Sequence, residues 1–151
     1  MKYLKIMLIP LLLVLVFGYD NNEKINQKVE FTEIGKGELF NLYQNNGSGI
    51  NLVIDNLADW DSFINTIDKP NNISANFTEI NIDFSNFQVI AIFDQIHNNG
   101  GWSIDVTGVT ENEDSLNVNI DNLQKGDLTS IVIQPFHIVK IQKTNKEIVF
   151  E

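Results

Sequence analysis

The sequence contains no cysteine. This absence excludes disulfide bonds, thiolate nucleophiles and cysteine-ligated metal sites, so the hydrophobic core must hold the fold without covalent cross-links. Histidine is scarce as well. His97 and His137 are the only two, and neither lies in a His-Glu-x-x-His or similar metal-ligand spacing. We therefore expect no metal site and no cofactor.

Arginine is also absent, and the ten lysines are scattered among 151 residues that carry 20 acidic side chains, for a formal net charge of −10. Nucleic-acid-binding proteins rely on clustered basic side chains to neutralise phosphates. We therefore expect no nucleic-acid partner. The acidic excess favours a solvated surface, or a partner that presents a basic surface.

The N-terminus has the pattern of an export signal. Lysines 2 and 5 precede a run from residue 6 to residue 18 that is apolar apart from one proline and one glycine. This run is shorter than the roughly 20 residues that span a bilayer as a helix, and a polar stretch follows it at once. The sequence predicts a signal peptide over 1–18, a flexible tether over 19–28 and one domain over 29–151.

The junction after the apolar run has two interpretations. The residues LVFGYDNNEK are similar to a bacterial lipoprotein signal, in which a lipid-bearing cysteine follows a small residue and precedes a polar tether. Tyr19 stands at the place of that cysteine and cannot form the thioether, so membrane attachment would require a cysteine at residue 19. The alternative is cleavage after Gly18 by ordinary signal peptidase. The sequence leaves both open.

The rest of the chain predicts an α+β domain made mainly of antiparallel β-sheet, as a half-open barrel or a sandwich, packed on one helix. The helix is expected near residues 56–67, with Asn56 as its N-cap and Pro70 as its stop. Its apolar side chains recur at spacings of three and four, at Leu57, Trp60, Phe63, Ile64 and Ile67.

Two runs carry the strongest β pattern. FQVIAIFDQI, from residue 87, is apolar on both faces, which is typical of a central strand buried on two sides. WSIDVTGV, from residue 102, alternates and predicts Trp102, Ile104 and Val106 inside with Ser103, Asp105 and Thr107 outside. We expect the two runs to form an antiparallel hairpin. Pro135 in a later strand predicts a bend or a sheet edge.

The segment HNNGGWS, residues 97–103, joins these two runs. It lacks the wider glycine spacing, the following helix and the lysine that a phosphate-binding loop needs. Residues that tolerate positive φ favour a tight turn between strands instead. No Gly-x-Ser-x-Gly elbow accompanies Ser103 or Ser130, so a serine nucleophile is not indicated and we expect no enzyme.

The order of several features resembles the PrcB C-terminal domain family of bacterial lipoproteins. These features are GSGI near residue 48, LADWDSFI, IDFSNFQVIAIF, NNGGWSIDV and QPFHIVKIQK, and together they cover about residues 47–150. The resemblance implies a non-catalytic protein of the bacterial cell envelope, or a secreted one, that binds and stabilises a secreted protease. The resemblance implies roles for seven positions, first in defining the fold and only second in binding a partner. They are Gly100, Gly101, Trp102, Pro135, Phe136, Val139 and Lys143.

A second function is a glycan or small-molecule binding module. In it, Trp102 and the neighbouring asparagines would form a stacking platform for a sugar ring. The exposure of Trp102 discriminates the two functions, because an indole that is more than half buried is a poor platform for a sugar.

Overall fold

The computed structural model describes residues 26–40, 48–69 and 72–151. The predicted signal peptide, Tyr19, residues 19–25 of the predicted tether and Pro70 lie outside the described residues. Gln27–Lys28 form strand β1, so strand structure is already present two residues before the predicted boundary at residue 29. Within the described ranges, no helix is long and apolar enough to cross a membrane.

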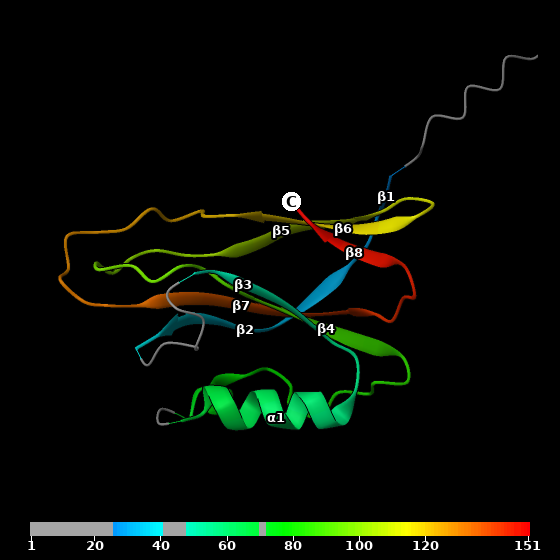
Figure 1. The fold of residues 1–151 in the computed structure, drawn as a ribbon, viewed down its shortest axis with the longest axis horizontal. Coiled ribbons are helices and arrows are strands. Elements are labelled where there is room, and N and C mark those ends of the chain that lie inside the picture. The colour runs from blue at the N-terminus through cyan, green and yellow to red at the C-terminus, as the bar shows by residue number, and fades with distance from the viewer. Residues whose placement is uncertain (1–25, 41–47, 70–71) are drawn as a thin grey trace, which may run out of the picture.

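In the described ranges, two four-stranded sheets and one α-helix are stacked in three layers, and neither sheet closes on itself (Figure 1). The outer sheet has the order β1-β5-β6-β8, with β5 at Asp105–Glu111, β6 at Ser115–Asp121 and β8 at Glu147–Phe150. The central sheet has the order β2-β7-β4-β3, with β2 at Phe31–Leu39, β7 at Gln134–Gln142, β4 at Phe87–Phe93 and β3 at Ile50–Ile54. All pairs are antiparallel except β6 with β8. The predicted α+β class with mainly antiparallel strands is confirmed.

Helix α1 spans Leu57–Ile67 and lies under the central sheet (Figure 1), as its apolar periodicity predicts. The Asn56 side chain accepts a hydrogen bond from the Asp59 backbone N–H at 2.9 Å, which caps the helix. Trp60, at 1% exposure, is buried against the sheet, and its Nε1–H donates to the Ile80 carbonyl at 2.8 Å. Leu57 instead is exposed at the first helical position. A short 3-10 helix, η1, follows at Ile73–Asn76.

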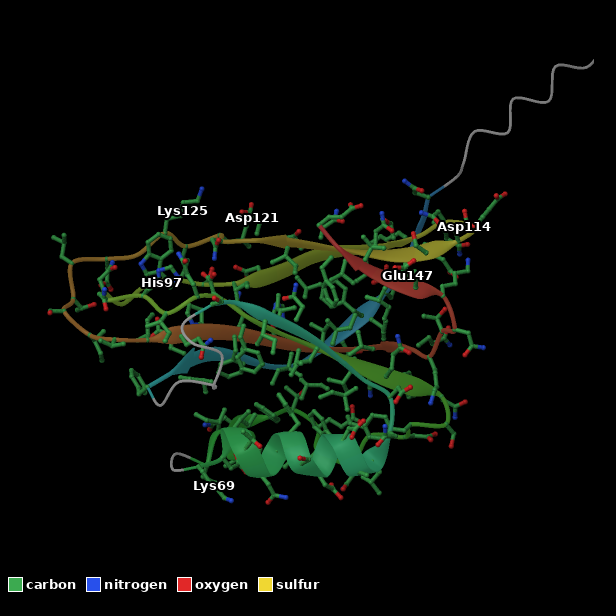
Figure 2. The ribbon with its side chains drawn as sticks, viewed as in Figure 1. Lys69, His97, Asp114, Asp121, Lys125 and Glu147 are labelled. Atoms are coloured by element: carbon green, nitrogen blue, oxygen red, sulfur yellow. The ribbon has the colours of Figure 1, made fainter. Side chains whose placement is uncertain are left out.

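Strand β4 is buried on both faces, as predicted, because each face meets a different core. Val89, Ala91 and Phe93 pack with the helix, whereas Ile90 and Ile92 face the outer sheet. The central sheet therefore separates a helix-side core from an inter-sheet core. The acidic Glu113 and Asp114 lie in the turn between β5 and β6, and Asp114 marks it in Figure 2.

The predicted hairpin between the two strong β runs is wrong. Strand β4 pairs with β3 and β7, whereas β5 pairs with β1 and β6 in the other sheet. Both edges of β4 are already occupied, so the chain after Phe93 must leave the central sheet and enter the outer one.

One further expectation about side chains is wrong, and one of the two alternatives for Pro135 is excluded. Ser103 and Asp105 are buried, at 7% and 3% exposure, because their polar atoms bond to each other and Asp105 also accepts a hydrogen bond from Lys36 on the central sheet. Pro135 is not at a sheet edge, because β7 lies between β2 and β4. It is the second residue of β7, near the strand start, where a missing N–H disturbs the ladder least.

Candidate functional site

Residues 94–104 run from the central to the outer sheet beside residues 122–133. Isolated bridges join His97 to Ile133 and Trp102 to Lys125, so HNNGGWS is a bent segment that crosses between the sheets rather than a tight hairpin turn. One glycine does have the positive φ that the sequence predicts. Gly101 has φ of 73°, and a Cβ there would lie 2.8 Å from Asp127 Oδ2.

An aromatic stack fixes this crossing segment. The rings of His97 and Trp102 lie 4.1 Å apart at an angle of 12°. His97 Nε2 lies 2.8 Å from Asp94 Oδ2, and Trp102 Nε1–H donates to Asn99 Oδ1 at 3.1 Å. His97 is inside the molecule, whereas Lys125 above it points outward (Figure 2). One face of the indole is therefore covered by an imidazole.

A hollow of about 420 Å³ opens beside Trp102, between the ends of the two sheets. Its floor comes from β2 and β7, and its roof from the crossing segment and Gln124. We call it the inter-sheet slot. Its lining residues are Lys36, Gly37, Glu38, Phe40, Trp102, Ser103, Ile104, Gln124 and Phe136.

A buried polar network lies behind the slot. The Lys36 ammonium donates to Asp105 Oδ1, and the Ser103 hydroxyl donates to Asp105 Oδ2 at 2.6 Å. The Leu123 N–H adds a longer bond to Oδ2 at 3.3 Å. Burial raises the pKa of Asp105, but the bonds from Lys36 and Ser103 outweigh it and hold this pKa below its ordinary value. Asp105 is therefore an ionised carboxylate that ties β2 to β5.

His137 makes a second link between the sheets. The Val106 N–H donates to His137 Nδ1 at 2.9 Å, and Nε2 lies 3.1 Å from Glu33 Oε2 without the alignment of a hydrogen bond. Burial lowers the pKa of His137, although Glu33 and Asp105 partly offset this effect. Neither histidine contacts the Ser103 hydroxyl in the described structure, because that hydroxyl bonds to Asp105 and accepts from the Gln124 N–H at 3.0 Å. The arrangement is not that of a nucleophile with its base.

The slot brings together two of the residues carried over from the family resemblance, Trp102 and Phe136. The others lie elsewhere. Val139 is in the inter-sheet core. The Lys143 ammonium is at the opposite end of β7, where it donates to the carbonyls of Asp55 and Phe84 at 2.9 Å each. Gly100 and Pro135 are buried.

A second concave surface lies between β3 and α1 and was not predicted from the sequence. It has a volume of about 250 Å³ and is lined by Leu52, Val53, Ile54, Asp59, Ser62, Phe63 and Thr66. We call it the β3–α1 groove. The four helical residues, Asp59, Ser62, Phe63 and Thr66, are spaced as on one face of a helix. The sequence therefore shows that they share a face, but nothing in it shows that this face lies beside an edge strand.

The described residues contain no group of three or more histidine, aspartate or glutamate side chains placed to hold a metal ion. In comparisons with known proteins, no family model, no curated protein and no solved structure matches the chain. The resemblance to the PrcB C-terminal domain therefore stays a prediction.

Proposed function

We propose that the chain is an exported, non-enzymatic protein-interaction domain that binds an extended segment of a partner at β3. The observation that carries this proposal is the position of β3. In the described structure it is an edge strand of the central sheet, and the β3–α1 groove runs alongside it. An edge strand with unpaired backbone groups is a template for a further strand.

If a partner strand adds at this edge, its backbone would supply most of the affinity and its side chains most of the specificity. Main-chain hydrogen bonds to β3 would hold the partner segment whatever its sequence. Every second side chain of that segment would point toward the helix, into a groove whose walls include Leu52 and Phe63. Val53 is 44% exposed, so an apolar residue already faces solvent at the edge. An apolar side chain of the partner would bury it.

The charge of the site favours a basic partner segment. Asp59 is the only charged residue that lines the groove, and the exposed Asp55 follows directly after β3. The whole chain carries a formal net charge of −10, which would steer a basic segment toward it. We therefore propose a segment in which lysine or arginine flanks an apolar residue.

More specific parts of the proposal rest on the family resemblance. The partner would be a secreted protease and the location the bacterial cell envelope, with membrane attachment only where residue 19 is a cysteine. The stacking of two open sheets supports a sandwich-like fold over a half-open barrel. The geometry gives less support to glycan binding by Trp102, because this indole is more than half buried and one of its faces lies against His97.

The test uses a displayed library of random linear peptides selected against residues 19–151. We expect enrichment of peptides that combine an apolar residue with flanking lysine or arginine. Ser62→Arg places a bulky cation over the groove and should abolish their binding. Asn65→Arg adds the same charge at an exposed position of α1 outside the groove and should leave binding nearly unchanged.

Two results would contradict the proposal. One is a selection that enriches no peptides, or peptides whose binding survives Ser62→Arg. The other is a concentration-dependent dimer, seen by sedimentation, that Ser62→Arg dissociates. That second result would assign the β3 edge to another copy of this chain.

A further inference from the structure

The inter-sheet slot contains a carboxylate that no described residue neutralises. Glu38 lies on β2 opposite Pro135 and is partly buried. In the described ranges its side chain has neither an ion pair nor a hydrogen bond, whereas the nearby Asp105 has three donors. A half-buried carboxylate without a partner loses hydration and gains nothing in return. Glu38 is thus the group in the slot that a ligand could satisfy.

The other side chains of the slot determine the charge and the shape of that ligand. Lys36 is the only base in the lining, and its ammonium is already neutralised by Asp105. The slot therefore has the net charge of Glu38 alone, which disfavours an anion. Trp102 and Phe40 supply aromatic walls, and aromatic rings attract cations as well as apolar stems. A neutral sugar would leave the carboxylate unpaired.

We infer that the inter-sheet slot binds the ammonium group of a primary alkylamine. The ammonium would lie against the Glu38 carboxylate, and the alkyl stem would lie along the aromatic walls. The hollow of about 420 Å³ is of the size that holds small ligands. This site is independent of the β3–α1 groove, because β2 and β3 are opposite edges of the central sheet.

A primary ammonium on an alkyl stem can come from two sources: the lysine side chain of a partner protein or a free alkyl diamine. The probes are therefore N-acetyl-lysine amide, 1,5-diaminopentane and, as the neutral isostere, N-acetyl-norleucine amide. Binding is followed by NMR through the indole N–H of Trp102, with the buried Trp60 as an internal reference. We expect saturable shifts of Trp102 with a dissociation constant of about 0.1–1 mM for the amines. The norleucine amide should cause no such shift.

Variants locate the ammonium. Glu38→Gln keeps the shape of the side chain and removes its charge, so it should weaken amine binding at least about tenfold. Glu113→Gln removes a charge from the exposed β5–β6 turn and should leave binding unchanged. Tighter binding of the lysine amide than of the diamine assigns the slot to a partner protein, and the reverse assigns it to a free amine.

The inference is overturned if neither amine shifts Trp102 at about 10 mM. It is also overturned if the norleucine amide binds as well as the lysine amide, or if Glu38→Gln binds amines like the unmodified chain. Loss of peptide binding through Ser62→Arg would not affect any of these readouts, so the groove and the slot can fail separately.

Discussion

The two sheets are joined at the residue level by buried polar contacts as well as by apolar packing. Lys36 and His137 on the central sheet reach Asp105 and the Val106 N–H on the outer sheet. The Nδ1 of His137 can accept the Val106 N–H only while it carries no proton. Protonation of this ring at Nδ1 would therefore place two donors against each other inside the protein.

This contact makes the stability of the domain depend on pH. Burial depresses the pKa of folded His137 below the ordinary value of 6.5, so the unfolded chain binds a proton more readily than the folded one. The free energy of unfolding should be fully retained above about pH 6.5 and should fall as the pH drops below it, by at most about 1.4 kcal/mol per unit. Urea titrations at several pH values between about 5.5 and 7.5, above the range in which carboxylates titrate, measure this slope.

His137→Gln removes the titrating ring and should flatten the slope, at some cost in stability because the contact with Val106 changes. His97→Gln is the matched control and should still show the decline that His137 causes. A slope that is unchanged in His137→Gln would contradict the assignment. The charged groups that act on His137 in the folded protein are Glu33, Lys36 and Asp105, and none of them is altered in either variant.

Sequence alone could not reveal this network. Asp105 has the alternation of an outward residue in WSIDV, and its partner Lys36 is 69 positions away in the chain. Trp102, which the alternation places inside with Ile104 and Val106, is only partly buried and lines the slot. The hollow at its side depends on where residues 36–40 of β2 lie, and no local pattern gives that position.

At the level of elements, helix α1 is determined locally. Its cap and its apolar face are both contained in residues 56–67, and both appear in the structure. The same is true of the doubly buried strand β4. Pairing is different, because it depends on segments far apart in the chain. The strand neighbours of β4 come from residues 50–54 and 134–142, and this is why adjacency in sequence gave the wrong hairpin partner.

The cap gives a prediction for the helix. Asn56→Ala removes the acceptor of the Asp59 N–H and should lower the free energy of unfolding by about 1 kcal/mol. Asn65→Ala on the exposed face of the same helix should change it by less than about 0.5 kcal/mol. Urea unfolding followed by far-UV circular dichroism measures both. Equal losses in the two variants would show that the cap contributes no more than an ordinary surface asparagine.

At the scale of the whole molecule, the central sheet belongs to both cores. Its strands β4 and β7 contribute Phe93 and Ile138 to the helix-side core and Ile92 and Val139 to the inter-sheet core. With no cysteine in the chain, no cross-link can hold one layer once the other has opened. Loss of either core would therefore expose one face of the sheet that supports the other core.

We therefore predict that the domain unfolds in one transition. Leu116→Ala in the inter-sheet core and Ile67→Ala in the helix-side core should each cost about 2–5 kcal/mol, because both side chains are buried. In a Trp102→Phe background, the fluorescence of Trp60 reports the helix-side core alone, while far-UV circular dichroism reports both sheets. If the cores are coupled through the central sheet, Leu116→Ala must shift the Trp60 transition as far as the dichroism transition, although Leu116 is in the other core. A Trp60 transition that stays in place while the dichroism splits into two steps would mean that the layers unfold independently, and the central sheet would then not be the element on which both depend.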